Sequence, residues 1–262
     1  MKKFIYWLLG LGLVVLMMLF IMGMNLIIEI TPYEIKDRRI TEDITIAFIS
    51  DLHGCDYGED LMDRIYAINP DVVLLGGDMV DEKMSTYWSY HYITMLKLDY
   101  PVYFVSGNHE YWTKDIENIK KKIRKLGATV LEGTCFDLKG VNVCGIDDYI
   151  ESKDDQLSKI TLDDAKFNIL LTHRPSYIED YLKYNYDLVL AGHAHGGQWR
   201  IPGLLNGLVA PDEWLFPKYA AGLYNVNNSK MIVNRGLAKE NTFVPRIYNR
   251  PEVVMIKLRP LD

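Results

Sequence analysis

The sequence predicts an α/β fold with layered sheets, preceded by a single membrane-spanning helix. An unbroken apolar stretch near the N-terminus is long enough to cross a bilayer, and the rest of the chain alternates strand-like apolar runs with helical segments. Such alternation is typical of α/β proteins, in which helices cover the faces of largely parallel sheets. A globular part of about 220 residues is consistent with one domain.

The first 43 residues are expected to form a membrane anchor and a linker. Lys2 and Lys3 precede an apolar run from residue 4 to residue 28, in which Asn25 is the only strongly polar residue. As a helix, this run would be roughly 37 Å long, which exceeds the thickness of the hydrocarbon core of a bilayer. A cleaved signal peptide has a shorter apolar region and a small-residue cleavage site, which we do not find here. A buried core helix fits poorly because the run has no polar face.

The charges that flank this run give its orientation. Lys2 and Lys3 favour a cytoplasmic N-terminus, which would place the globular part on the extracytoplasmic side of the cell membrane. Lys36, Arg38 and Arg39 lie beyond the run and weaken this bias. We interpret residues 29–43 as a polar linker and residues 44–262 as the globular domain.

The globular part contains eight apolar runs that predict strands. Many are nearly continuous rather than alternating, as expected for strands covered on both faces. They span residues 44–50, 71–77, 101–107, 141–146, 167–173, 186–192, 230–236 and 252–258. Three helices are expected between them, at residues 58–69, 113–127 and 175–185, where capping and stop residues bound amphipathic patterns.

Two of the three cysteines lie in a predicted hairpin. The stretch TCFDLKGVNVCG turns at Lys139-Gly140, and that register places Cys135 opposite Cys144. A disulfide between them is geometrically possible and would suit an oxidising compartment. The alternative, which we favour from the sequence, is two small apolar side chains on the core face.

Polar side chains gather where five of the predicted strands end. Five of the six histidines lie at these positions, and four of the five stand directly beside Gly or Asn. Groups at the carboxyl ends of strands in an open α/β sheet can meet in one place. In chain order, the residues are Asp51 and His53, then Asp78 and Asp81, then Asn108, His109 and Glu110, then His173, and finally His193 and His195.

This set of side chains predicts a metal site. Carboxylates, imidazoles and one amide oxygen suit Mn²⁺, Fe or Zn²⁺ better than Ca²⁺, and the lack of a cysteine argues against a structural zinc site. A carboxylate can bridge two cations, and two cations about 3.5–4 Å apart can clamp a phosphoryl group and activate a water. The formal net charge of −6 argues against a nucleic-acid partner.

These motifs together resemble the calcineurin-like metallophosphoesterase superfamily. Its signature is D-x-H, G-D-x-x-D, G-N-H-D/E, a single H and G-H-x-H, and all five blocks occur here in that order. The stretches GHAHGGQWRIPG, FPKYAAGLY and NRPEVVMIKL are similar to the membrane-associated YkuE/YaeI-type branch, over about residues 44–258. The resemblance implies a four-layer αββα sandwich and two bound divalent metal ions, with Mg²⁺ less suitable than Mn²⁺, Fe or Zn²⁺.

The resemblance also implies a role for each motif residue. One metal would be bound by Asp51, His53, Asp78 and His195, and the other by Asp78, Asn108, His173 and His193, with Asp78 bridging. A metal-bound hydroxide would attack phosphorus, and His109 would be the catalytic residue that stabilises the phosphoryl group or protonates the leaving oxygen. Asp81 would orient His109 or simply cap a turn. Arg174 would reach a phosphate oxygen or be an ordinary surface arginine.

The implied activity is hydrolysis of a phosphodiester or a pyrophosphate by a membrane-anchored enzyme. A phosphomonoesterase is an alternative, and so is a non-catalytic scaffold that keeps the fold, although no motif residue is missing. The apolar segment 201–217 follows the last histidines and includes Trp214, Leu215 and Phe216. It either faces a lipid-linked substrate or, as we favour from the sequence, is buried in the core. The sequence indicates no protein partner.

Overall fold

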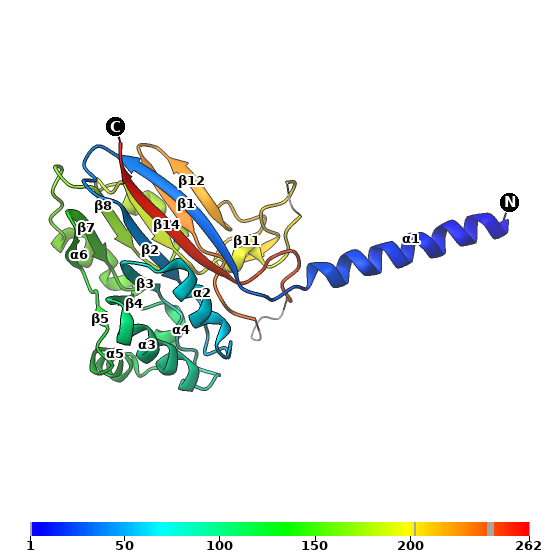
Figure 1. Ribbon diagram of the computed structural model, residues 1–262, viewed down its shortest axis with the longest axis horizontal. Helices are drawn as coiled ribbons and strands as arrows, with labels where there is room; N and C mark the ends of the chain where they lie inside the picture. The colour runs from blue at the N-terminus through cyan, green and yellow to red at the C-terminus, as the bar shows by residue number, and fades with distance from the viewer. Residues whose placement is uncertain (1, 202, 240–243, 262) are drawn as a thin grey trace.

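The computed structural model describes residues 2–201, 203–239 and 244–261. A long N-terminal helix, α1 (Lys2–Gly23), projects from a globular part that carries all the other elements (Figure 1). Among the described residues, α1 is the one helix long and apolar enough to cross a membrane. Its mean hydropathy is 2.6, and none of its apolar window is buried against the rest of the protein.

The first sheet has six strands in the order β1-β14-β2-β3-β4-β5. All neighbouring pairs are parallel except β14 and β2. The strands are β1 (Glu29–Asp37), β14 (Glu252–Pro260), β2 (Ile44–Ile49), β3 (Val72–Gly76), β4 (Val102–Val105) and β5 (Thr129–Val130). Every residue of β3 is buried, which explains why this strand reads as a continuous apolar run.

The second sheet also has six strands, in the order β12-β13-β9-β8-β7-β6. Its central strands β13, β9, β8 and β7 are parallel, and β12 and β6 pair antiparallel at the two edges. The strands are β12 (Gly222–Val226), β13 (Ser229–Val233), β9 (Leu188–Ala191), β8 (Asn168–Leu171), β7 (Val141–Gly145) and β6 (Thr134–Leu138).

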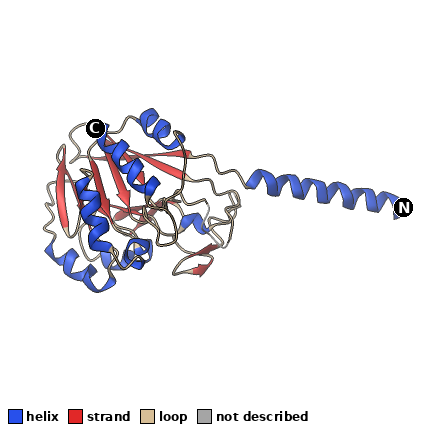
Figure 2. Cartoon of the chain, turned by 90° about the horizontal axis from the view of Figure 1, so that it is seen from below, coloured by secondary structure: helices blue, strands red, loops and turns tan. Residues whose placement is uncertain are grey.

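Three apolar clusters divide the globular part into four layers. The middle cluster lies between the two sheets and joins Phe48 and Leu74 of the first sheet to Val143, Leu171 and Ile232 of the second. A second cluster packs the first sheet against α2 (Asp60–Ile68), α3 (Tyr87–Asp99) and α5 (Ile116–Lys125). A third packs the second sheet against α6 (Ile150–Lys159) and α7 (Ile178–Tyr181). The predicted αββα sandwich is confirmed (Figure 2).

The expected linker is partly wrong, because residues 29–37 form β1. This strand pairs in parallel with β14 along its whole length. As an edge strand it is only partly buried, so charged residues alternate with apolar ones and Pro32 is tolerated. The helix also ends at Gly23 rather than at residue 28. Ile28 does not belong to the anchor, since it is fully buried in the core beside the first sheet.

Three helices were not predicted, and the one expected at residues 175–185 was predicted too long. The helix α3 is rich in aromatic residues, and α6 is largely polar, so neither has a clear apolar stripe. The expected helix 175–185 is instead a 3₁₀ turn, η1 (Pro175–Tyr177), followed by the single turn α7. The short helix α4 (Asn108–Trp112) begins directly within the GNHE motif.

The predicted hairpin register is confirmed, and our preference for reduced cysteines is wrong. Cys135 faces Cys144 across β6 and β7, and the two form a disulfide. Cys144 is buried, whereas Cys135 is exposed because β6 lies at the edge of its sheet. An exposed position does not give Cys135 the core packing that the alternative requires. The third cysteine, Cys55, is fully buried.

Candidate metal centre and active-site cleft

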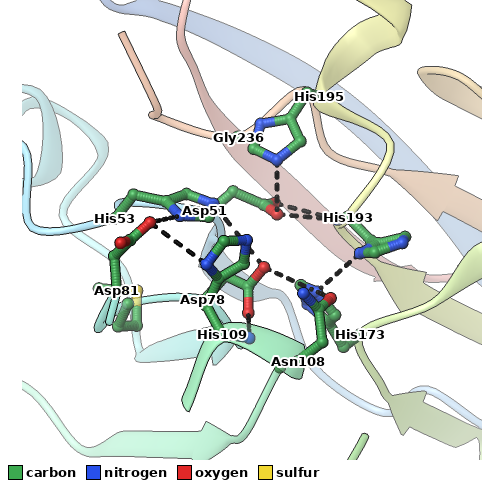
Figure 3. Close-up of polar contacts among 12 residues, drawn as sticks. Asp51, His53, Asp78, Asp81, Asn108, His109, His173, His193, His195 and Gly236 are labelled. Atoms are coloured by element: carbon green, nitrogen blue, oxygen red, sulfur yellow. Dashed lines mark hydrogen bonds and ion pairs between the residues drawn. The ribbon is translucent and has the colours of Figure 1, made fainter. Parts of the chain in front are cut away.

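The eight residues predicted as metal ligands or as the catalytic residue lie together at one edge of the sandwich (Figure 3). The loops after β2, β3 and β4 of the first sheet meet the loops after β8 and β9 of the second. All eight side chains are buried or nearly so. They are Asp51, His53, Asp78, Asn108, His109, His173, His193 and His195.

Five of these residues have a left-handed backbone. The φ angles are 53° for Asp51, 49° for His53, 52° for Asp78, 64° for His193 and 48° for His195. Each such angle in a residue other than glycine costs of the order of 1 kcal/mol, and backbone strain of this kind concentrates at functional sites. The surrounding fold therefore holds these side chains inward against a local conformational preference.

Two glycines allow the loops after β3 and β4 to touch. A Cβ atom on Gly77 would lie 2.6 Å from the nitrogen of Gly107, and Gly77 itself has a φ of 88°. A Cβ atom on Gly107 would lie 2.2 Å from Oδ1 of Asp78. Only glycine fits this close approach of the backbone, which places Asp78 beside the loop of Asn108 and His109.

One cluster of potential metal-binding atoms comes from Asp51, His53 and His195. Nε2 of His195 lies 3.8 Å from Oδ1 of Asp51, and the rings of His53 and His195 have centroids 5.1 Å apart. The Asp51 carboxylate also accepts the backbone N–H of His193, so it orients the loop that carries both histidines.

A second cluster comes from Asp78, His173 and His193. Nε2 of His173 lies 3.1 Å from Oδ2 of Asp78, 3.2 Å from Oδ1 of Asn108 and 3.1 Å from Nδ1 of His193. The same Oδ2 of Asp78 lies 3.7 Å from Nε2 of His53. Asp78 therefore stands between the two clusters and faces both.

The side chains present fit a pair of bound cations. Nε2 of His53 is buried and makes no hydrogen bond, although such an atom is costly to leave unpaired. Burial alone would lower the pKa of His173, but the charge and hydrogen bond of Asp78 raise it to about 10. The negative charge that holds a proton there also favours a cation, because metal binding displaces protons from its ligands.

His109 lies at the rim of the clusters between two carboxylates. Its Nδ1 is 2.7 Å from Oε2 of Glu82 and 3.2 Å from Oδ2 of Asp81. Burial lowers the pKa of His109, but the hydrogen bond to Asp81, the charge of Asp78 and the bond to Glu82 raise it to about 9. Asp81 combines the two alternatives, because it contacts His109 and accepts the N–H of Lys83 in a turn, and it also lies 2.8 Å from Nδ1 of His53.

Glu110 joins the loops beneath the site, a role the sequence did not assign. Its buried carboxylate accepts three backbone N–H groups, from Asp78 at 2.9 Å, Val80 at 2.8 Å and Gly107 at 2.8 Å. The GNHE motif placed Glu110 at the right position, but its partners are set by the approach of two separate loops. Glu110 thus fixes the backbone of Asp78 from below.

Arg174 is neither an isolated surface arginine nor free of partners. Its Nε donates to both oxygens of Asp148, at 2.8 and 2.9 Å, and its Nη1 donates to Oδ2 of Asp212 at 2.6 Å. Oδ2 of Asp212 also lies 3.1 Å from Nε2 of His193, and Nη1 of Arg174 lies 3.5 Å from the same nitrogen. Asp148 and Asp212 carry no motif, so sequence reasoning missed both.

A cavity of about 370 Å³ opens over His53 and His195 of the first cluster and over His109. One wall is polar and includes His53, Asp81, His109 and His195. The opposite wall is largely apolar and comes mainly from the segment around the small hairpin of β10 (Val209–Ala210) and β11 (Trp214–Leu215). It is lined by Val209, Ala210, Pro211, Trp214, Ala238 and Val244. The cavity therefore presents a reactive polar face and an apolar face to one ligand.

The fold and these clusters define a class of protein. Residues 44–197 match the family described as calcineurin-like phosphoesterase, and the chain belongs to that family. A solved structure with the same fold is that of phosphopantetheinyl hydrolase from Mycobacterium tuberculosis. It has a TM-score of 0.51 and 11% sequence identity, and the match covers 78% of this chain and 95% of that one.

Curated relatives place the chain in the YkuE-type branch. It is 29% identical over 251 residues to the uncharacterized metallophosphoesterase YkuE of Bacillus subtilis, covering 88% of this chain and 86% of the relative. It is 33% identical over 175 residues to a metallophosphoesterase of Helicobacter pylori, covering 61% of this chain and 46% of that protein, so the chain spans about half the length of that relative. A transmembrane protein with a metallophosphoesterase domain from Danio rerio is 27% identical over 258 residues, with coverages of 88% and 57%.

Proposed function

We propose that the protein is a membrane-anchored phosphoesterase that uses two divalent metal ions to hydrolyse a phosphodiester or a pyrophosphate. One observation carries this proposal. The carboxylate of Asp78 lies between two clusters of potential metal-binding atoms, and His53 and His195 of one cluster line a cavity together with His109. Paired cations bridged by a carboxylate are a recurring device for phosphoryl chemistry.

The two metal sites use the residues expected from the sequence. Asp51, His53, Asp78 and His195 would hold one cation, and Asp78, Asn108, His173 and His193 would hold the other. The mixture of imidazole nitrogens and carboxylate oxygens suits Mn²⁺, Fe or Zn²⁺ better than Mg²⁺. Asp81 on Nδ1 of His53 and Asp212 on Nε2 of His193 orient the two imidazoles from behind.

The chain's own groups supply orientation and proton transfer. When bound, the two cations supply Lewis-acid activation of a water and neutralisation of phosphoryl charge. His109 is held by Asp81 and Glu82 through Nδ1, and these carboxylates favour its charged form, so it is suited to stabilise a phosphoryl oxygen or protonate the leaving oxygen. Arg174 engages Asp148 through Nε and Asp212 through Nη1, so it positions the carboxylate of Asp212 beside His193.

The shape of the cavity favours a substrate with an apolar portion. A diester or pyrophosphate has a second substituent on phosphorus, and the apolar wall opposite the histidines gives that substituent a place. Trp214 lines this wall and is 78% exposed, so the wall continues to the protein surface. This arrangement supports a lipid-linked phosphoester as the substrate class.

The helix α1 anchors the enzyme in the cell membrane as a single span, with the catalytic domain on the extracytoplasmic side. The apolar length of α1 supports the span. The disulfide between Cys135 and Cys144 supports an oxidising compartment, because such bonds are rare in the cytosol.

The proposal is tested with the full chain in detergent micelles. Bound metal is removed by chelation, and Mn²⁺, Zn²⁺, Fe²⁺ or Mg²⁺ is added back separately before hydrolysis of a chromogenic diester and monoester is measured. We expect turnover to return with Mn²⁺, Zn²⁺ or Fe²⁺, and to be faster on the diester.

Two histidine variants control this assay. His109→Ala should lower kcat by about 10²–10⁴-fold while the bound metal content stays the same. His91→Ala is the matched control, because His91 lies on α3 among aromatic rings and outside the cavity. Protein that binds two metal ions and cleaves neither substrate would contradict a general phosphoesterase. Equal losses in the two variants would contradict the role of His109.

A further inference from the structure

The segment after the last histidines exposes several large apolar side chains. We expected from the sequence that residues 201–217 are buried, and this is wrong: of the described residues in this segment only Gly207 and Ala210 are buried, and five large apolar side chains are exposed. The exposed fractions are 50% for Ile201, 83% for Leu204, 78% for Trp214, 61% for Leu215 and 66% for Phe216. We call these five residues the apolar rim. Large apolar groups exposed this close together in the sequence indicate a surface that contacts something other than water.

The apolar rim lies at the end of the globular part from which α1 leaves. In Figure 1 both the label of β11 and the loops beside it are on the α1 side of the sandwich. Short contacts connect the two regions. Trp199 forms a β-bridge with Ile247. The next residue, Tyr248, contacts the end of α1, because its N–H donates to the carbonyl of Gly23 and its hydroxyl donates to the carbonyl of Leu19.

The apolar rim is also tied to the candidate metal centre. The N–H of Phe216 donates to the carbonyl of Leu208 at 2.8 Å, and the N–H of Leu208 donates to that of Gly197 at 2.9 Å, two residues after His195. Trp214 contributes to both the rim and the cavity wall. Any body that contacts the rim therefore lies directly beside the mouth of the cavity.

We propose that the apolar rim inserts into the surface of the same bilayer that α1 crosses, so that the cavity opens at the level of the lipid headgroups. The occupant is a membrane rather than a partner protein because the rim is continuous with the end of the proposed anchor. Tryptophan is enriched at membrane interfaces, and here Trp214 stands between the apolar surface and the polar cavity. This inference rests on the proposed membrane span of α1 and extends it by a second contact.

The seating of the rim has a consequence for substrate access. A phosphoester carried by a lipid would reach the apolar wall of the cavity without leaving the membrane interface. A water-soluble ester would have to enter from the remaining open side. The rim thus favours substrates embedded in the bilayer through position rather than through tighter chemistry at the metal centre.

Spin labels on the full chain in phosphatidylglycerol and phosphatidylcholine nanodiscs test the proposal. Labels are attached to the variants Leu204→Cys and Leu215→Cys. For each label, the rate of collision with oxygen, which concentrates in lipid, is compared with the rate of collision with a nickel complex, which stays in water. Leu98→Cys on α3 is the matched control, because Leu98 is apolar and 72% exposed on the outer helical layer. Cys55 is buried and the other two cysteines form a disulfide, so the native chain gives a low background of labelling.

We expect both rim labels to favour oxygen and to report a depth of about 5–10 Å, whereas the label at Leu98 reports water. Rim labels that match the label at Leu98 would overturn the proposal. Shielding from both reagents together with spin–spin broadening would mean contact with another protein chain, and would also overturn it.

A fourth label separates this inference from the proposed anchor. Val14→Cys lies midway along α1 and is expected deep in the hydrocarbon. If the label at Val14 reports lipid while the rim labels report water, the anchor stands and the rim proposal falls alone. If the label at Val14 reports water, the proposed anchor is refuted. If the rim labels also report water, the proposed insertion of the apolar rim is refuted as well. Metal-dependent hydrolysis in micelles depends on neither result.

Discussion

Replacing Glu110 by Gln is expected to destabilise the protein by about 2 kcal/mol. The carboxylate accepts three backbone N–H groups and is fully buried. The amide of Gln has only one acceptor oxygen. In the more favourable of its two orientations, this oxygen still accepts the N–H groups of Asp78 and Gly107, and the NH₂ group then faces the N–H of Val80. One buried donor then loses its partner, which costs about 1–3 kcal/mol. For a chain of this size, that corresponds to a fall in Tm of about 4–8 °C.

The assay is thermal unfolding of the full chain in micelles, followed by a titration of metal affinity. Because Glu110 fixes the backbone of Asp78, the affinity should also fall, by about tenfold. Glu117→Gln on α5 is the matched control, since its side chain is 81% exposed and its effect should stay within about 0.5 kcal/mol. A Tm for Glu110→Gln equal to that of the native chain would refute the reasoning that the three N–H bonds hold the two loops.

Three further predictions concern the metal centre and the disulfide. Asp212→Asn removes a charge 3.1 Å from Nε2 of His193. Because Asp212 is one-third exposed, the affinity for metal should fall by only about tenfold. An unchanged metal affinity, measured in competition with a chromogenic chelator, would contradict this role of Asp212. Chelation should lower the Tm by about 5–10 °C, because ions that bind only the folded state stabilise it, and re-addition of metal should restore the Tm. Calorimetry without such a shift would argue against bound metal. Replacing Cys135 and Cys144 together by Ser opens a short loop and should cost about 2–3 kcal/mol in urea unfolding, whereas an unchanged midpoint would show that the disulfide does not stabilise the domain.

The parts of the fold that could be predicted are those whose burial is complete. Strands such as β3 and β9 are covered on both faces, so every position is apolar and the run is visible in the sequence. β1 was missed because an edge strand needs only one apolar face, and its charges suggested a linker. The aromatic helix α3 was missed because its side chains do not form a clear apolar stripe.

The residues of the candidate site also fall into a group that the sequence predicted and a group that it did not. The motif residues were predicted because each follows a strand directly, and the ends of neighbouring strands meet at one edge of the sandwich. The carboxylates of Glu82, Asp148 and Asp212 were missed because their partners come from other loops. No local pattern marks such a residue, since its role depends on which loop lies opposite.

The sequence by itself determined the layered α/β class, the apolar N-terminal helix and the eight residues at the strand ends, because these depend on local periodicity and on motif spacing. Only the tertiary structure decided which atoms meet. It placed Asp78 between two clusters, gave Glu110 its three N–H partners and joined Cys135 to Cys144. It also showed Trp214 exposed rather than buried. The physical reason is that burial and pairing belong to contacts between segments far apart in the chain, and the apolar character of one segment is the same whether a core or solvent lies beside it.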